Sequence, residues 1–208
     1  MIKAFFLIFE PAVAWDRIAQ ARRGFAFILC LYLLPMILLA TATEAWGLDR
    51  WGKWQPNFQK FREFSRHEIM TFEVIQVTLS LLMIFLGALI ILKISETFQS
   101  RRKYLDAFTT VAYGYSPLFL LRLLDAGPMV SPWVTWGIGI MLTIWILYQG
   151  IPRVMQPDPT HAFGLYLSAM IVVALTSGLA RFVTGLYLLG EVDFHHSYLT
   201  HKFPNLFQ

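Results

Sequence analysis

Long apolar runs separated by short polar segments make up most of this chain. A helix needs about 20 apolar residues to cross a bilayer, and five runs approach or exceed that length. Gly114 and Pro117 interrupt the third run, and Arg122 and Asp125 shorten its apolar stretch. A re-entrant or tilted helix is therefore the alternative for that segment. We predict membrane spans at about 24–43, 69–92, 106–124, 132–151 and 162–189.

The polar segment before the first span predicts an amphipathic helix. In PAVAWDRIAQARRG, residues 11–24, Trp15 and Ile18 share one face, while Asp16 and Arg17 share the other. Proline suits the first turn of a helix, and an amphipathic helix of this kind lies in the headgroup layer of a membrane. Packing of this helix against the spans is an equal alternative.

The loop between the first two spans is rich in aromatic residues. Apolar residues recur every three to five positions at Phe58, Phe61, Phe64, Ile69 and Phe72. This spacing predicts a helix that begins near Asn57 and continues into the second span. Tryptophan concentrates at membrane interfaces, so interfacial packing is favoured here over a ligand-stacking surface. The tryptophans of this loop are Trp46, Trp51 and Trp54.

Composition supports the same class of protein. The chain is 57% hydrophobic and 14% charged, whereas soluble domains carry about 25% charged residues. Cys30 is the one cysteine, which excludes an intrachain disulfide and a thiolate metal site. We therefore predict an all-α polytopic membrane protein with residues 1–208 as a single integral membrane domain. Its fold is expected to be a bundle of five transmembrane helices with N-terminal and first-loop interfacial helices.

Basic residues orient the predicted spans. The net charge is +4, but lysine and arginine lie mostly at span ends, so the charge asymmetry of a bilayer explains them and nucleic acid is not an expected partner. Arg22, Arg23 and the run at 101–103 directly abut spans, where the positive-inside bias is strongest. We predict a cytoplasmic N-terminus and a periplasmic or extracellular C-terminus.

Three charged residues fall within or near the apolar runs: Glu73, Arg122 and Arg181. In the predicted topology all three lie towards the outer side of the membrane. Intramembrane charges are costly unless they pair, so Glu73 is expected to pair with one of the arginines. The alternative is that the long arginine side chains extend to the interface. A transport pathway lined by these groups is less favoured.

The C-terminal tail EVDFHHSYLTHKFPNLFQ holds three candidate metal ligands, His195, His196 and His201. Histidine binds transition metals, but adjacent histidines rarely point the same way, and the spacing matches no helical metal motif. We favour a solvated or partner-contacting tail, and we expect no metal and no cofactor.

A proline-rich joint separates the last two spans. Its notable residues are Pro152, Arg153, Pro157, Asp158 and Pro159. Proline fixes φ and favours an extended residue before it, so these prolines forbid one continuous helix. Asp158 offers a negative charge to the positive end of the last helix, and Arg153 lies at the negative end of the helix before. We predict a rigid cytoplasmic hairpin, with a partner-docking surface as the alternative.

Three segments in this order and spacing carry a family resemblance: FEPAVAWDRIA (9–19), AYGYSPLFLLRLL (112–124) and LYQGIPRVMQPDPTHAF (147–163). They resemble, in turn, the opening segment, the third span and the fourth-to-fifth joint of the Yip domain family. These polytopic membrane proteins were first named for interacting with Ypt/Rab GTPases. The predicted span count and topology also agree, so the resemblance covers nearly the whole chain.

The resemblance also shapes the expected location and partners. Eukaryotic relatives carry a long cytosolic segment before the first span, whereas only about two dozen residues precede it here. That is similar to the short bacterial form, and because bacteria lack Rab GTPases, no Rab partner is expected. The resemblance implies a compact, often oligomeric protein of the bacterial cytoplasmic (inner) membrane, with no catalytic residues generally assigned.

We predict a non-enzymatic scaffold, assembly or accessory subunit of a membrane complex, in contact with lipids and with a membrane-protein partner or a second copy of itself. A transporter or channel subunit is the alternative, and it needs a continuous polar path between the helices. A metal-dependent membrane enzyme that uses the C-terminal tail ranks last. Candidates for lining a path are Gln76, Thr78, Ser80, Thr109, Thr110, Tyr113, Tyr115, Thr143 and Gln149.

Overall fold

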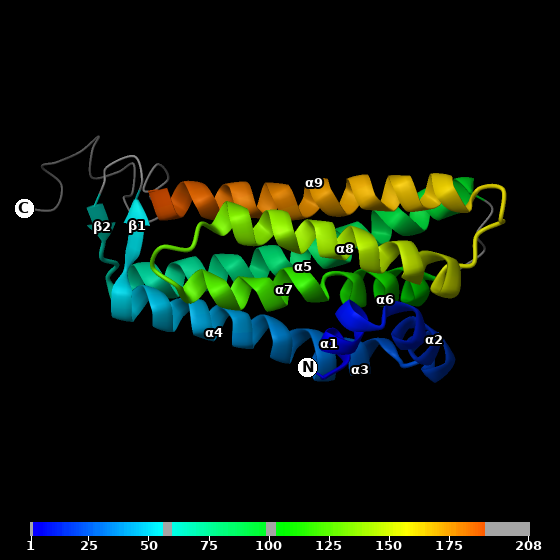
Figure 1. Ribbon diagram of the computed structural model, residues 1–208, viewed down its shortest axis with the longest axis horizontal. Helices are drawn as coiled ribbons and strands as arrows, with labels where there is room; N and C mark the ends of the chain where they lie inside the picture. The colour runs from blue at the N-terminus through cyan, green and yellow to red at the C-terminus, as the bar shows by residue number, and fades with distance from the viewer. Residues whose placement is uncertain (1, 56–59, 99–102, 190–208) are drawn as a thin grey trace, which may run out of the picture.

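The computed structural model describes residues 2–55, 60–98 and 103–189, and this part of the chain is almost entirely helical. Its elements are α1 (Ile2–Phe9), α2 (Pro11–Ala21), α3 (Phe25–Ile28), the π-helical turn η1 (Leu29–Leu33), α4 (Leu34–Trp51), β1 (Lys53–Gln55), β2 (Lys60–Arg62), α5 (Arg66–Thr97), α6 (Tyr104–Gly114), α7 (Ser116–Arg122), the tight helical turn η2 (Leu123–Ala126), α8 (Pro132–Val154) and α9 (Ala162–Leu189). Figure 1 shows the long helices side by side along one axis, with β1 and β2 at one end and α1, α2 and α3 near the other. We call these the hairpin end and the amino-terminal end.

Four helical stretches are long and apolar enough to cross a membrane. They are Phe25–Trp51, Arg66–Thr97, Pro132–Val154 and Ala162–Leu188. Each exceeds the ~20 residues that the hydrocarbon core of a bilayer requires. The first continues well past the predicted end of its span at residue 43. The chain is therefore a multi-pass helical membrane protein.

The segment predicted as the third span is a broken helix. Tyr115 separates α6, which has 11 residues, from α7, which has 7. Pro117 lies in the first turn of α7, and a proline cannot donate to the hydrogen-bond ladder of a longer helix. Length and composition therefore do not identify a fifth span here. The two pieces nevertheless run end to end from the amino-terminal end towards the hairpin end (Figure 1).

Pro35 produces a different irregularity in the first membrane helix. The N–H of Leu34 bonds to the carbonyl of Leu29, five residues earlier, so the turn before the proline is π-helical. A proline ring clashes with the carbonyl four residues before it, and a wider turn moves that carbonyl away. The helix therefore continues through Pro35 instead of ending there.

The predicted first-loop helix is wrong. The described part of this loop forms an antiparallel strand pair in which Trp54 lies opposite Phe61, with ring centroids 5.1 Å apart. Helix α5 begins only at Arg66, where Ser65 accepts a hydrogen bond from the Glu68 N–H and the Glu68 carboxylate accepts one from the Ser65 N–H. This reciprocal cap defines the helix start and leaves the preceding residues extended.

The amino-terminal helices pack on the bundle. Trp15 of α2 is fully buried, and its indole N–H donates to the carbonyl of Ile146 in α8 at 2.9 Å. Helix α2 therefore packs against the membrane helices, which is the second of the two alternatives for this segment, and does not lie free in the headgroup layer. Phe5, Phe6 and Phe9 of α1 remain exposed, which suits contact with a bilayer surface.

Two apolar clusters frame the interior. The larger fills the amino-terminal half of the bundle and includes Trp15, Phe108 and Leu147. The smaller lies at the hairpin end and includes Leu48 and Phe72. The bundle also buries charged side chains, among them Glu44, Arg122 and Arg181.

A buried polar network as the candidate functional site

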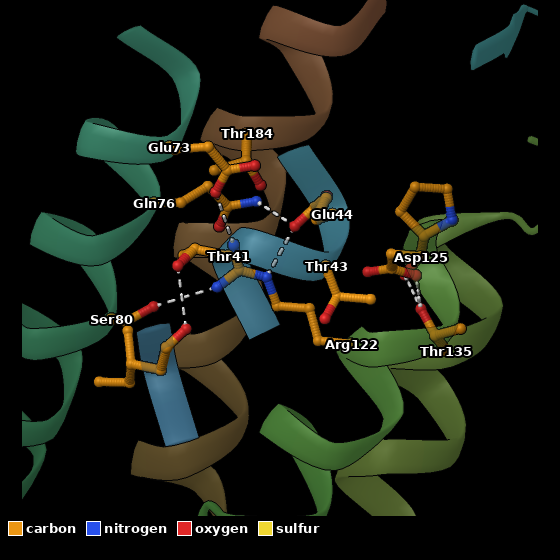
Figure 2. A network of polar contacts seen from close by, with 12 residues as sticks. Thr41, Thr43, Glu44, Glu73, Gln76, Ser80, Arg122, Asp125, Thr135 and Thr184 are labelled. Atoms are coloured by element: carbon orange, nitrogen blue, oxygen red, sulfur yellow. Dashed lines mark hydrogen bonds and ion pairs between the residues drawn. The ribbon is translucent and has the colours of Figure 1, made fainter. Parts of the chain in front are cut away.

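An ion pair between Arg122 of α7 and Glu44 of α4 lies at the centre of a polar network inside the bundle (Figure 2). Arg122 Nε donates to Glu44 Oε2 at 2.9 Å, and only 8% and 1% of the two side chains are exposed. Gln76 of α5 donates to the same carboxylate oxygen at 3.4 Å, and Arg122 Nη1 donates to Ser80 Oγ at 3.4 Å. The network therefore connects α4, α5 and α7 through hydrogen bonds.

Glu73 lies beside this pair. Its Oε2 is 3.7 Å from Arg122 Nη2, an ion-pair contact without a hydrogen bond. Both Glu73 carboxylate oxygens and Arg122 Nη2 are buried and have no hydrogen-bond partner within the described ranges. Arg122 is therefore shared between two carboxylates, and Glu44 is the closer of the two.

Arg181 of α9 pairs with Asp125 of η2 and not with Glu73. Its Nη2 donates to Asp125 Oδ2, and its Nε donates to the carbonyl of Pro132 at 3.0 Å. The Thr135 hydroxyl donates to the other oxygen of Asp125, whose side chain is 0% exposed. This second cluster ties α9 to η2 and to the start of α8.

Sequence reasoning did not identify Glu44 or Asp125 as partners of the arginines because both lie one residue beyond a predicted span. A rule based on apolar runs ends a span at the first charge, whereas a buried carboxylate is tolerated when it is paired. For Glu44 a signal was present in the sequence. It continues the buried face of α4 at helical spacing from Ile37 and Thr41, and Leu48 extends that face beyond it.

Lys53 of β1 closes the hairpin end of the network. Its ammonium group donates to the carbonyls of Asp125 at 2.6 Å and Gly127 at 3.1 Å. Burial lowers the pKa of the Lys53 amine from its usual value, while the nearby Asp125 carboxylate acts in the opposite direction. The buried set thus holds three basic and three acidic side chains: Lys53, Arg122, Arg181, Glu44, Glu73 and Asp125.

A cavity of about 50 Å³ adjoins both arginines. Arg122, Arg181, Ser80 and Thr135 are among its lining side chains, and Met83 and Leu118 line it as well. A water molecule needs about 10–15 Å³ by this kind of measure, so the space admits a few waters or a small ion. The arrangement can therefore hydrate or bind a small polar species next to two guanidinium groups.

The other polar residues considered for a path mostly join helices or bond within their own helix. The Tyr115 hydroxyl bonds to Thr176 Oγ1 of α9 at 2.6 Å, and the Thr78 hydroxyl donates to the carbonyl of Val74 in its own helix at 2.8 Å. Thr109 donates to the carbonyl of Leu105 in its own helix at 2.6 Å. Hydroxyl groups of this kind satisfy backbone or cross-helix acceptors within a membrane.

The proline joint differs in one respect from its prediction. Pro152 does not end α8, which continues to Val154. The turn itself lies between α8 and α9 and contains Pro157 and Pro159. Pro152 lies two residues before the end of α8, so less than one helical turn follows the residue that lacks an N–H.

The two charged residues of the joint are both bonded. Arg153 donates from Nη1 to the Gln149 carbonyl at 2.7 Å and from Nε to Asp16 of α2 at 2.9 Å. Asp158 Oδ1 accepts hydrogen bonds from the side-chain hydroxyl and the backbone N–H of Thr160. These two bonds, the side-chain bond first, lower the pKa of the Asp158 carboxyl from its usual value.

The histidines considered as metal ligands, His195, His196 and His201, lie outside the described residues. Within residues 2–55, 60–98 and 103–189, no group of three or more His, Cys, Asp or Glu side chains is arranged to hold a metal ion.

A family model for the Yip1 domain matches residues 5–181. The comparison with curated proteins gives no match, and neither does the comparison with solved structures. The matched range is most of the chain and includes α2, the broken α6–α7 segment and the proline joint, which are the three segments that carried the resemblance. The chain therefore belongs to the Yip1 domain family.

Proposed function

We propose that this chain is a non-enzymatic subunit of a membrane complex in the bacterial cytoplasmic membrane, where it serves as a scaffold, an assembly factor or an accessory protein. Its partner is another membrane protein or a second copy of the chain, and it contacts that partner laterally through the outer face of α8.

The observation that carries this proposal is the position of Trp145. The residue lies in the middle third of α8, a helix of 23 residues, and it is 54% exposed. Its indole N–H has no acceptor within the described part of the chain. Tryptophan normally lies at the membrane interface, where water or headgroups accept from its N–H. At mid-bilayer depth, an acceptor on a neighbouring helix would satisfy this group.

The same face of α8 has room for a second helix. Gly137, Met141 and Trp145 follow one another at four-residue spacing, and a side chain added at Gly137 would meet nothing within 4 Å. Small residues on the surface of a membrane helix allow a partner backbone to approach closely. Exposed Ile138 widens the apolar surface around this point.

The buried charges support an architectural role. Arg122 and Arg181 bind carboxylates inside the bundle and so join α4, α5, α7, η2 and α9. Intramembrane charges that pair with one another stabilise one arrangement of helices. A bundle held in this way offers a stable surface to a partner.

We further propose five membrane crossings with the N-terminus in the cytoplasm. The support is the broken α6–α7 segment, which runs between the same two ends of the bundle as its neighbours (Figure 1). Broken helices are tolerated at membrane depth when other helices cover the freed backbone groups, and Tyr115 and Ser116 at the break are fully buried.

The test is recovery of partners from membranes with three variants. The tagged chain is extracted in a mild detergent, and co-purifying proteins and lipids are identified by mass spectrometry. Trp145→Phe removes the N–H and retains an aromatic ring, so it should reduce partner recovery about threefold or more. Gly137→Leu should abolish recovery. Trp133→Phe is the matched control, because Trp133 is exposed at the start of the same helix. A chain that purifies alone, or equal recovery with all variants, contradicts the proposal.

A transporter or channel subunit is the second candidate, and the cavity beside Arg122 and Arg181 favours it. Ser80→Leu would fill this cavity without altering the outer face of α8. Loss of cellular function in Ser80→Leu with normal partner recovery, together with solute flux by the reconstituted wild-type chain, would favour transport over the accessory role.

A further inference from the structure

A second cavity opens at the amino-terminal end, between the end of α2, the start of α6 and the end of α8. Its volume is about 370 Å³, within the usual range of ~300–1,000 Å³ for small-molecule sites. None of its described lining residues also lines the cavity beside Arg122. The two are therefore separate features of the bundle.

Basic side chains dominate the charge of this cavity. Arg22, Arg23, Lys103 and Arg153 line it, and among the described residues Asp106 is the one acidic residue of its lining. Within the described part of the chain, the first three have no ion-pair partner. Neighbouring cations repel one another, and a bound anion would relieve that repulsion.

Two of the arginines are held in place by neighbouring groups. Arg153 donates from Nε to Asp16 and from Nη1 to the Gln149 carbonyl. Its Nη2 has no bond within the described ranges and can donate to a ligand. The guanidinium carbon of Arg23 lies 4.0 Å from the centroid of the Phe27 ring. Positioned donors lose less entropy when a ligand binds.

The backbone also takes an uncommon form at this cavity. In the described chain, the two non-glycine residues with positive φ are Arg22 at 39° and Gln156 at 42°, and both line the cavity. Each lies directly at the end of a helix, Arg22 after α2 and Gln156 after α8, where a left-handed residue commonly terminates the helix. Here they turn the chain after α2 and after α8 towards the same space.

We propose that this cavity binds a phosphate group, carried by an anionic lipid headgroup or by a soluble phosphate compound. The planar fork of arginine matches the oxygens of a phosphate, and a lysine adds a mobile point charge. Basic pockets between membrane helices bind phosphorylated headgroups. The inference does not depend on the proposed function, because it rests on the lining of a different part of the bundle.

Binding is tested on the full chain purified in a neutral detergent. The lipid probe is phosphatidic acid, and diacylglycerol, which lacks only the phosphate, is its control. The soluble probe is inorganic phosphate, with chloride at equal ionic strength as control. We expect a saturable rise in Tm with one or both phosphate probes and none with the controls. Phosphatidic acid alone indicates a headgroup site, and a response to inorganic phosphate indicates a soluble ligand. No response to either probe overturns the proposal.

A pair of double variants separates a site from general surface charge. Arg23→Gln with Lys103→Gln should weaken phosphate binding about tenfold or more. The two substitutions remove charged donors, whose hydrogen bonds to a phosphate are stronger than those of neutral donors. Arg17→Gln with Lys93→Gln removes two exposed positive charges outside the cavity lining. This control should change affinity by less than about twofold. Equal losses from the two double variants overturn the proposal, and the Tm of each without ligand checks its fold.

Discussion

Glu44 and Arg122 lie 78 positions apart in the sequence and 2.9 Å apart inside the bundle. Each charge would be costly to bury alone, because an ion removed from water loses its hydration. Together they form a nearly inaccessible pair that joins α4 to α7. We therefore expect Glu44 to contribute more than Glu73 to the stability of the bundle.

Glu44→Ala should destabilise the bundle more than Glu73→Ala does. The first leaves Arg122 without its hydrogen-bonded partner, at a cost of about 3 kcal/mol in the free energy of unfolding. The second removes a contact of 3.7 Å that includes no hydrogen bond. Glu63→Ala is the control, because Glu63 is exposed and should have almost no effect. Thermal unfolding in detergent measures all three, and equal effects of Glu44→Ala and Glu73→Ala would reject this ranking.

Asp125 and Arg181 should show strong coupling in a double-mutant cycle. Asp125→Leu or Arg181→Met alone leaves one buried charge unpaired, whereas the double variant removes both charges together. We expect the double variant to be more stable than either single variant, with a coupling energy of about 2–3 kcal/mol. Additive losses would mean that the two side chains do not stabilise each other.

Gly150→Ala should loosen the attachment of α2. A Cβ at Gly150 would lie 2.3 Å from the indole ring of Trp15, so that ring must move. We expect a lower Tm and faster tryptic cleavage at Arg22 and Arg23. Gly137→Ala is the matched control on the same helix, because its Cβ meets nothing within 4 Å. There the better helix propensity of alanine should leave Tm unchanged or raise it slightly.

Cysteine labelling should place Arg23 and Arg153 on the cytoplasmic side and Trp54 and Met129 on the opposite side. In a Cys30→Ser background, each position is changed to Cys and treated with a membrane-impermeant maleimide before and after permeabilisation. Trp54 and Met129 are adjacent to the hairpin end, where the Trp54 N–H donates to the carbonyl of Pro128. Labelling of Met129 from the cytoplasm would mean that the α6–α7 segment does not cross.

The double variant Pro157→Ala with Pro159→Ala should loosen the packing of α8 against α9. The two prolines lie in the turn between these helices, and alanine increases the conformational freedom of the unfolded joint. We expect faster proteolysis near Gln156. Pro152→Ala is the control, because Pro152 lies within α8 and should not open the turn. Full stability together with loss of a co-purifying partner would instead identify the joint as a docking site.

The sequence by itself determined the membrane class and most of the helices. Apolar runs must be helical in a bilayer, because nothing there replaces the internal hydrogen bonds of the backbone. Proline has a local effect that sequence also reveals, so the break near Pro117 and the turn at Pro157 and Pro159 were predictable. Short ordered motifs also indicated the Yip family, and the Yip1 domain model confirmed that resemblance.

Only the tertiary structure decided the partners of the buried charges and the form of the first loop. Aromatic spacing around Phe61 predicts a helix, but the loop is held extended where Lys53 and Trp54 bond to η2 and to the turn after it. Arg181 likewise selects Asp125 over Glu73 because Asp125 is the carboxylate within its reach in the folded bundle. Periodicity depends on neighbours along the chain, whereas a buried charge is stabilised by neighbours in space, which the order of residues does not reveal.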